Sequence, residues 1–164
     1  SLRGKNMDAI VAVYSDWGIG ADGTQPVVLK ADRQHFVELT RGKTVIVGRR
    51  TLADFPGGRP LKGRRNIVLT RQEISIDGAE IAHSAQEAAE MCGADAMVLG
   101  GQSVFRDMMQ YIDRVFVTKI NSCPNSDSYF ENLDEAAAWR IESQSEILRE
   151  GDIEYRFICY ERIK

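Results

Sequence analysis

The stretch AMVLGGQSVF, residues 96–105, decides the fold class of this 164-residue chain. It opens with a short apolar run, continues with two glycines, and ends in residues suited to the start of a helix. A short apolar run that ends at a turn is typical of a parallel strand covered on both faces. The stretch therefore predicts a strand, a tight turn and a helix, the repeating unit of an α/β sheet.

Three further apolar runs have the same character, and each ends in glycine or other turn residues. They span residues 9–14, 44–47 and 66–69. Helical patterns are predicted at about residues 31–39, just after Thr51, and at residues 85–91 and 103–111. This alternation predicts a mostly parallel sheet with right-handed crossovers.

The last third of the chain departs from this pattern. Residues 114–120 and 153–161 are long strand-like segments, and the second alternates apolar with polar residues. We expect them to form an antiparallel pair at the edge of the sheet. The predicted fold is one α/β domain over residues 7–164, with a mostly parallel central sheet, an antiparallel C-terminal edge strand and flanking helices. Residues 1–6 are interpreted as an N-terminal extension or a cloning remnant.

The composition excludes several classes of protein. The chain is 43% hydrophobic and 27% charged, which is ordinary for a globular domain. A net charge of -3 and a pI near 5.5 argue against nucleic-acid binding, and no apolar run is long enough to span a membrane. Three cysteines and two distant histidines predict neither a disulfide framework nor a metal site. We expect a cytoplasmic, monomeric protein that acts on a small molecule.

The segment LKADRQHFVEL, residues 29–39, raises a question about its aspartate. Asp32, Phe36 and Leu39 fall on one face of the predicted helix, at the spacing of a buried stripe. The first member of that stripe is a carboxylic acid. It either caps the helix N-terminus or faces inward to meet a ligand, and the segment alone leaves both explanations open.

Two junctions of strand, glycine and helix could together hold the phosphates of a dinucleotide. One lies at residues 98–105, and the other, VIVGRRT, at residues 45–51. A helix N-terminus offers unpaired N–H groups and a partial positive charge, and glycine lets the backbone come close. Arg49, Arg50 and Arg71 add positive charge. Ordinary turns and a solvated arginine surface are the competing explanations.

A Rossmann fold does not fit this chain. No GxGxxG motif opens the first helix, and no acid closes the second strand to hold a ribose hydroxyl. Instead the strand at residues 66–70 is followed by Arg71, which suits the 2′-phosphate of NADP rather than NAD. The long Gly-rich loop at residues 15–26 is predicted to be a lid or binding loop, and residues 56–65 form a second, basic loop.

Several of these segments together resemble the dihydrofolate reductase family. The match runs from Met7 nearly to the C-terminus, and its specificity comes from the order and spacing of eight motifs. They are WGIG at 17–20, LxxDxxxF at 29–36, GKTVIVGRRT at 42–51, GRPLxGR at 58–64, NIVLT at 66–70, LGG at 99–101, VT at 117–118 and DxxF at 127–130. The resemblance implies NADPH-dependent reduction of 7,8-dihydrofolate to 5,6,7,8-tetrahydrofolate by hydride transfer to C6 and protonation of N5. That reaction feeds one-carbon and thymidylate metabolism.

The resemblance also implies roles for individual residues. Asp32 would pair with N3 and the 2-amino group of the pterin, supported by the Thr118 hydroxyl, so these two are the candidate catalytic residues. Arg64 would clamp the α-carboxylate of the glutamate tail, a task for which a planar guanidinium is suited. The other implied substrate contacts, for which ordinary core packing is the alternative, are Val11, Ala12, Val28, Phe36, Phe55, Leu61 and Leu99.

The implied cofactor is NADPH, with no metal. Its contacts would fall into three groups: Ala12, Ile19, Gly20 and Phe105 near the nicotinamide; Gly48, Arg49, Arg50, Thr51, Gly100, Gly101, Gln102, Ser103 and Val104 around the pyrophosphate; and Thr70 and Arg71 at the 2′-phosphate. The peptide bond between Gly100 and Gly101 is cis in the family.

Four positions depart from the family pattern. Val27 stands where the family usually has a tryptophan that closes over the substrate, and Trp17 is a candidate for partial cover from another place. Phe105 stands where many members have tyrosine, Arg33 where an apolar residue is frequent, and Ser126 where glycine is frequent. None of these changes removes the acid, the clamp or the phosphate sites.

Two other functions stay open at this point. The pyrimidine reductase of riboflavin synthesis has a similar fold but acts on a substrate with a ribityl phosphate, and a non-catalytic dinucleotide-binding module is a different class altogether. Asp32 on the first helix, with Arg64 placed for a carboxylate tail, favours folate.

Overall fold

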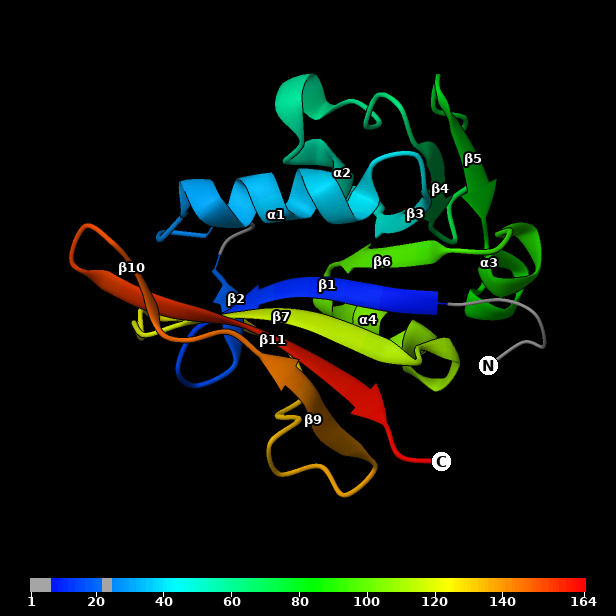
Figure 1. Ribbon diagram of the computed structural model, residues 1–164. Helices are drawn as coiled ribbons and strands as arrows, with labels where there is room; N and C mark the ends of the chain where they lie inside the picture. Colours follow the sequence, from blue (N-terminus) through cyan, green and yellow to red (C-terminus); the bar gives the residue numbers. More distant parts are fainter. Residues whose placement is uncertain (1–6, 22–24) are drawn as a thin grey trace.

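The computed structural model describes residues 7–21 and 25–164, and a nine-stranded sheet forms its centre (Figure 1). The strands of this sheet are β1 (Met7–Val13), β3 (Thr44–Gly48), β4 (Arg65–Leu69), β5 (Ala79–Ala82), β6 (Ala96–Gly100), β7 (Arg114–Ile120), β9 (Trp139–Gln144), β10 (Leu148–Glu150) and β11 (Ile153–Arg162). Their order is β10-β11-β7-β1-β6-β3-β4-β5, and β9 also pairs with β11. A separate two-stranded sheet joins β2 (Gly18–Gly20) to β8 (Ser128–Tyr129). Residues 1–6 and 22–24 lie outside this description, and so does the interpretation of the N-terminal extension.

The four apolar runs of the sequence are strands β1, β3, β4 and β6, and they pair in parallel as predicted. Every residue of β3 and β6 is buried, which explains their uninterrupted apolar character. The neighbouring pairs β1–β7 and β4–β5 are parallel too. The carboxyl ends of β1, β3, β4 and β6 therefore meet at one edge of the sheet, where ligands of open α/β sheets bind.

The antiparallel C-terminal pair is confirmed, with β7 beside β11 and Thr118 opposite Phe157. However, β11 is not the outermost strand, because β9 and β10 pair with its far side. The sequence analysis did not predict these two strands. In β9 only Trp139 is buried and the other residues are exposed, so this strand has no apolar signature.

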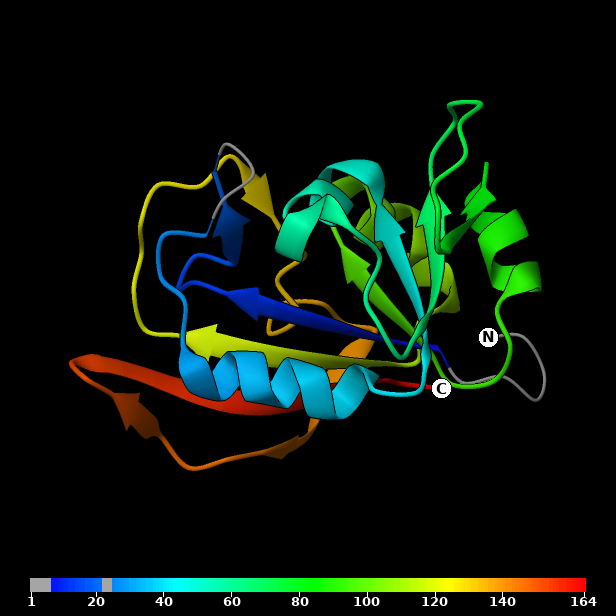
Figure 2. The ribbon, with the colours of Figure 1, turned by 90° about the horizontal axis from the view of Figure 1, so that it is seen from above.

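The helices cover both faces of the sheet (Figures 1 and 2). They are α1 (Lys30–Thr40), α2 (Arg49–Ala53), α3 (Ala85–Met91) and α4 (Gln102–Met108), with the 3-10 turns η1 (Pro56–Gly58) and η2 (Met109–Tyr111). One apolar cluster lies between the sheet and α1 and α2, and another between the sheet and α3 and α4. The helix predicted over residues 103–111 is thus α4 followed by η2, and α2 begins at Arg49, before Thr51. No helix in the described residues is both long and apolar enough to cross a membrane.

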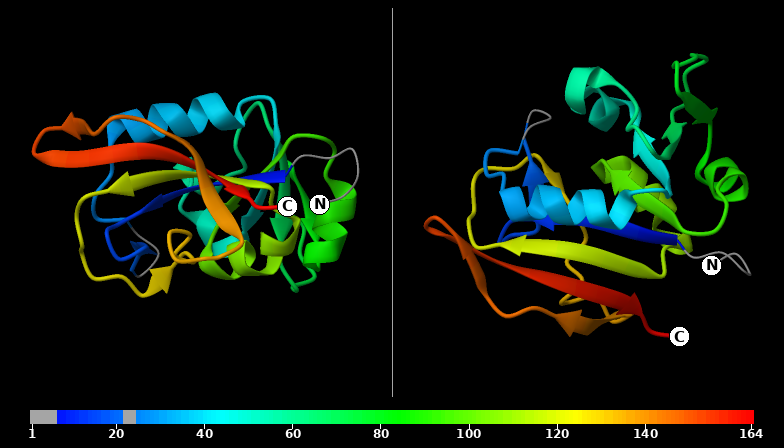
Figure 3. Two further views of the ribbon diagram at one scale, coloured as in Figure 1. Left: turned by 60° about the horizontal axis from the view of Figure 1, so that its bottom comes forward. Right: turned by 45° about the horizontal axis from the view of Figure 1, so that its top comes forward.

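The predicted lid loop at residues 15–26 is tied to the segment around β8. Gly18 pairs with Tyr129 and Gly20 with Ser128, and the two short strands lie side by side in Figures 2 and 3. The N–H of Phe130 donates to the carbonyl of Trp17 at 2.9 Å. This pairing joins the loop after β1 to the segment around β8, although residues 22–24 of the predicted loop are not described.

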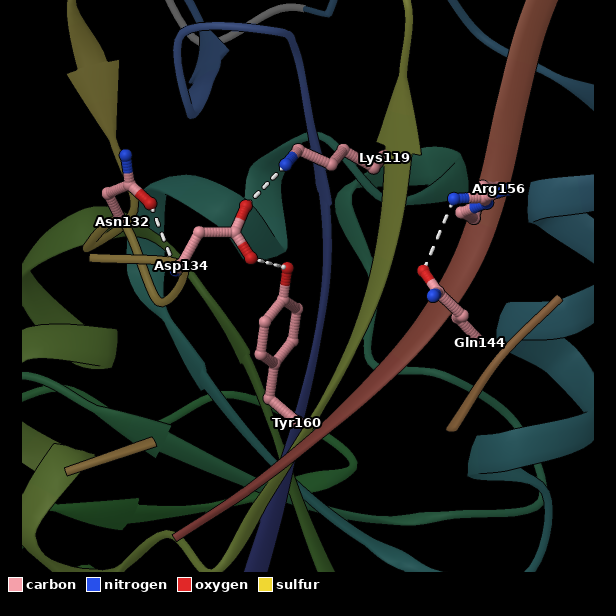
Figure 4. A network of polar contacts seen from close by, with 6 residues as sticks. All are labelled: Lys119, Asn132, Asp134, Gln144, Arg156 and Tyr160. Atoms are coloured by element: carbon pink, nitrogen blue, oxygen red, sulfur yellow. Dashed lines mark hydrogen bonds and ion pairs between the residues drawn. The ribbon is translucent and has the colours of Figure 1, made fainter. Parts of the chain in front are cut away.

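A polar network holds the chain that follows β8 (Figure 4). The carboxylate of Asp134 accepts hydrogen bonds from Lys119 Nζ at 2.5 Å and from the Tyr160 hydroxyl at 2.7 Å. Burial alone would raise the pKa of Asp134, but these two hydrogen bonds lower it below its usual range. The network therefore connects the loop after β8 to both β7 and β11.

Candidate active site

Asp32 lies in the first turn of α1 and faces the sheet instead of capping the helix. The cap position is Leu29, which makes no side-chain cap hydrogen bond, so the N-cap explanation for Asp32 is wrong. The Oδ1 of Asp32 accepts a hydrogen bond of 2.5 Å from the hydroxyl of Thr118 on β7. Since Thr118 is 1% exposed, this contact anchors the acid to a rigid strand.

The surroundings of Asp32 are poorly solvated. Burial raises the pKa of this carboxyl group, and the Thr118 hydrogen bond and the charge of His35 oppose the rise only in part. The His35 ring stacks on Phe157 with ring centroids 4.2 Å apart, and burial lowers the pKa of His35. Among the described residues, Thr118 is the one hydrogen-bond partner of the Asp32 carboxylate. The second oxygen is therefore available to a ligand.

Most of the predicted apolar substrate contacts gather on the face of the sheet that α1 covers. Phe36, Phe55 and Leu61 are partly buried and pack against one cluster with the buried Leu99, and Ala12 packs against the neighbouring cluster near Leu29. Two predicted contacts behave differently. Val28 is 48% exposed, and Val11 packs into the core on the face covered by α3 and α4.

Arg64 is held in place by groups that the sequence analysis did not identify. Its Nε donates to Thr40 Oγ1 at 3.2 Å, and its Nη1 donates to the carbonyl of Lys62 at 2.7 Å. The Thr40 hydroxyl in turn donates to the carbonyl of Phe36 at 2.7 Å, and Thr40 is fully buried. Burial and the neighbouring Arg41 lower the pKa of Arg64. This orientation leaves Nη2 without a hydrogen bond to any described residue, free for an anion.

The two strand–glycine–helix junctions lie next to each other. Val47 on β3 is the register partner of Gly100 on β6, and the peptide bond between Gly100 and Gly101 is cis, as the family resemblance implied. The cap positions of α2 and α4 are Gly48 and Gly101, and neither is capped by a side chain. A Cβ on Gly48 would lie 2.9 Å from Val104, and one on Gly101 would lie 3.2 Å from Thr51. Glycine therefore lets the two junctions pack closely together, and their uncapped helix starts fit a pyrophosphate group.

A cavity of 460 Å³ lies beside α2, at the carboxyl end of β4. The Nη1 of Arg49 hydrogen-bonds to Gln72 Oε1 across it, and the carbonyl of Thr70 contacts His83 Nδ1 at 2.9 Å. Its lining consists of Arg49, Arg50, Ala53, Thr70, Arg71 and Gln72. The structure therefore brings together the three arginines assigned from sequence to the phosphates, in a pocket whose chemistry suits a dianion.

Two glutamine side chains at the site make hydrogen bonds that the sequence did not predict. The Nε2 of Gln25 donates to the carbonyls of Ala12 and Ile19 at 3.4 and 3.3 Å. The Oε1 of Gln102 accepts from the backbone N–H of Tyr129 at 2.7 Å, so this side chain holds β8, and its predicted contact with a phosphate stays a prediction. Neither contact has a sequence signal, because each joins a single polar side chain to a distant main chain.

Trp17 lies in the core, which argues against the partial cover of the substrate considered for it. Trp17 is 4% exposed and packs against Phe130 and Tyr160, in the cluster on the face opposite Asp32. Phe105 is buried in the same cluster, with its ring centroid 4.9 Å from that of Phe130. Val27 is partly buried, and its N–H donates to the Tyr14 hydroxyl at 3.1 Å.

The chain is similar to known proteins in both sequence and structure. Residues 6–162 match the model of the family described as "Dihydrofolate reductase". The dihydrofolate reductase of Bacillus subtilis is 31% identical over 158 residues, which cover 93% of this chain and 92% of that protein. The dihydrofolate reductase of Mycobacterium tuberculosis is 36% identical over 149 residues, 88% of this chain and 90% of that protein. A solved structure of dihydrofolate reductase from Enterococcus faecalis, complexed with NADP(H) and RAB-propyl, has a TM-score of 0.86 at 27% identity and covers 97% of both chains.

Proposed function

This chain belongs to the dihydrofolate reductase family, and from that premise we propose that it reduces 7,8-dihydrofolate to 5,6,7,8-tetrahydrofolate with NADPH. The observation that carries the proposal is the inward-facing Asp32, bonded to Thr118 and otherwise unpaired among the described residues. It lies on the helix that also contributes Phe36 to the apolar cluster with Leu99. An acid so placed serves a ligand and not the fold.

Asp32 would recognise the pterin through both carboxylate oxygens. A carboxylate presents two acceptors side by side, so it can receive N3–H and the 2-amino group together. In a poorly solvated site this pairing is much stronger than in water, and it favours the protonated ring. Protonation at N5 increases the positive character of C6, the atom that accepts hydride. Thr118 would keep the carboxylate in the required plane.

The rest of the substrate would lie along the apolar face below α1. On this face, Ala12, Phe36, Phe55, Leu61 and Leu99 remain our proposed contacts for the pterin and aminobenzoyl groups. Val11, whose side chain packs on the other face of the sheet, and the exposed Val28 also remain proposed contacts. Arg64 would bind the α-carboxylate of the glutamate tail, because Thr40 and Lys62 already fix two of its nitrogens and leave Nη2 free.

NADPH, when bound, supplies hydride from C4 of its nicotinamide ring. The adjacent, uncapped helix starts at Gly48 and Gly101 support a pyrophosphate there, with Arg50, Thr51, Gly100, Gln102, Ser103 and Val104 around it. Arg49, Thr70 and Arg71 in the arginine-lined pocket would bind the 2′-phosphate. Ala12, Ile19, Gly20 and Phe105 would surround the nicotinamide end. We further propose that the protein is a cytoplasmic monomer whose product feeds one-carbon and thymidylate metabolism.

The test is a steady-state assay that follows NADPH absorbance with two substrates in parallel. We expect NADPH oxidation with 7,8-dihydrofolate and none with the ribityl-phosphate pyrimidine of riboflavin synthesis. Oxidation with the pyrimidine alone would assign the chain to the alternative reductase. NADPH binding without turnover of either substrate would support a non-catalytic binding module.

A further inference from the structure

Glu150, the last residue of β10, contacts the N-terminus of α1 although 120 residues separate it from Lys30. Its Oε2 accepts a hydrogen bond from the backbone N–H of Lys30 at 2.9 Å, and its Oε1 accepts one from Ala31 at 3.2 Å. Both N–H groups belong to the first turn of the helix, where no partner exists inside the helix. Glu150 therefore acts as a cap supplied from another part of the chain.

The helix needs this cap because its own residues do not provide one. Leu29 at the cap position has no polar side chain, and no side chain of the helix bonds its first turn. Asp32 is the acidic residue of that turn, but its Oδ1 is engaged by Thr118. The carboxylate that could have stabilised the helix start is used at the candidate site, and Glu150 takes the structural task instead.

Glu150 on β10 and Thr118 on β7 lie on strands that are joined through β11. Glu150 pairs with Ile153 across the β10–β11 hairpin, and Phe157 on β11 pairs with Thr118 on β7. The same hairpin packs on the start of α1, since Leu29, Ala31, Leu148 and Ile153 belong to one apolar cluster. Figure 1 shows β10 beside the beginning of α1. Asp32 is thus connected to the β10–β11 hairpin through α1, and Thr118 is connected to the same hairpin through the pairing of β7 with β11.

Charge supports the contact. The hydrogen bonds from Lys30 and Ala31, in that order, lower the pKa of Glu150, so it is ionised at neutral pH. A negative group at a helix N-terminus is stabilised by the partial positive charge of the unpaired N–H groups.

We propose that Glu150 is a positioning residue for Asp32: by bonding the N–H groups one and two residues before Asp32, it keeps that carboxylate at hydrogen-bond distance from Thr118. Its effect on turnover rests on the proposed function, whereas the capping contact does not. Glu150 itself has no place in the proposed substrate or cofactor contacts.

The experiment compares Glu150→Ala and Glu150→Gln with Glu154→Gln as the matched control. Glu154 lies on the same hairpin and forms an ion pair with Arg149 at 3.4 Å, so its substitution removes the same charge without touching α1. Three quantities are measured: amide hydrogen exchange at Lys30 and Ala31, kcat/KM for dihydrofolate, and the Kd for NADPH.

For Glu150→Ala we expect exchange to accelerate about fivefold and kcat/KM to fall about fivefold, the usual effect of losing a helix cap. The Kd for NADPH should stay unchanged. Glu150→Gln should fall between wild type and Glu150→Ala, because its amide oxygen can still accept one of the two hydrogen bonds. Glu154→Gln should match wild type in all three quantities.

Unchanged exchange in Glu150→Ala would overturn the capping contact. Faster exchange with unchanged kcat/KM would overturn the positioning role, and so would an equal loss of affinity for NADPH, since that indicates general loosening. If the wild-type protein does not reduce dihydrofolate, the proposed function fails, yet the exchange measurement still decides whether Glu150 caps α1.

Discussion

Asp32 is costly to the fold, and in the proposed function its task begins when a ligand binds. In the free protein its carboxylate is poorly solvated and is bonded by the Thr118 hydroxyl at 2.5 Å. The charged form of a partly buried acid with one hydrogen-bond partner is stabilised less than it would be in water. Such an arrangement is typical of a site whose second partner arrives with the substrate.

The cost of Asp32 can be measured as stability. Because burial raises its pKa in the folded state, the folded protein binds the proton more tightly than the unfolded chain, and stability falls as pH rises toward the folded pKa. We expect Asp32→Asn to be more stable than wild type at neutral pH, by about 1.4 kcal/mol for each unit of the pKa shift. The asparagine oxygen can still accept the Thr118 hydroxyl.

Urea unfolding across a pH series provides the check. The gain should vanish at pH values below the ordinary pKa of an aspartate, and the exposed Asp77→Asn should show no gain at any pH. A destabilised Asp32→Asn protein at neutral pH would show that the carboxylate supports the fold.

We expect Thr118 to influence the acid limb of the pH profile of kcat/KM. Its hydroxyl lowers the pKa of Asp32, so Thr118→Val should raise that pKa further. In this variant Asp32 would become protonated at a higher pH than in wild type, so kcat/KM should begin to fall at a higher pH. The plateau value of kcat/KM should also fall about tenfold, the usual value of a hydrogen bond to a charged group. If the acid limb of kcat/KM lies at the same pH in Thr118→Val and wild type, Thr118 does not affect the group that titrates.

The elements that were predictable from sequence are those with a strong apolar pattern. Strands β1, β3, β4 and β6 and helix α3 appear within a few residues of their predicted bounds, because each buries a face that its composition reveals. Strands β5, β9 and β10 were missed because they are short or largely exposed.

The strands that were not predicted from sequence limited the prediction of the site as well. Asp32 and the arginines of the pocket stood out from their positions in the sequence, whereas Thr118 and Arg64 were identified through the family resemblance. The structure brings Asp32 to Thr118. The contacts of Thr40, Gln102 and Glu150 were not identified, because each depends on how two distant elements meet.

The arginine-lined pocket between α2 and the end of β4 should select the cofactor. Arg71→Ala removes a positive charge next to Thr70, so we expect the Kd for NADPH to rise about tenfold or more, as for loss of a charge-assisted hydrogen bond. The Kd for NADH, which lacks the 2′-phosphate, should hardly change. Fluorescence titration with both cofactors measures the two constants, and the exposed Arg59→Ala is the control. Equal losses for NADPH and NADH would contradict a 2′-phosphate site.

At the scale of the whole molecule, the apolar clusters on the two faces of the sheet differ in what they contact. The cluster around Trp17, Phe105 and Phe130 packs under α3 and α4 and contributes bulk to the fold. The cluster around Phe36 and Leu99, below α1, borders Asp32 and Arg64. The polar network of Figure 4 connects the loop after β8 to the first of these clusters.

Tyr160 should matter for stability of the whole fold. Its hydroxyl donates to Asp134, and Tyr160→Phe removes that bond while keeping the ring against Trp17. We expect a loss of about 1 to 3 kcal/mol in the free energy of unfolding at neutral pH. Because the pKa of Asp134 is lowered, the loss should be complete above the ordinary aspartate pKa and should disappear as pH falls through the folded pKa.

Chemical denaturation of Tyr160→Phe beside Tyr129→Phe measures this effect. Tyr129 is exposed, and its hydroxyl donates to the carbonyl of Ser126 at 3.1 Å. Equal and small losses in both variants would mean that the Asp134 network does not stabilise the fold.

The most direct measurement is the rate of NADPH oxidation by wild type and Asp32→Asn, with dihydrofolate, as pH is lowered from neutral. At neutral pH we expect the variant to lose about a hundredfold or more in rate while its Kd for NADPH is unchanged, because only the acid is missing. At low pH its rate should recover, since the substrate then arrives already protonated. A variant as fast as wild type at neutral pH would show that Asp32 has no part in the reaction.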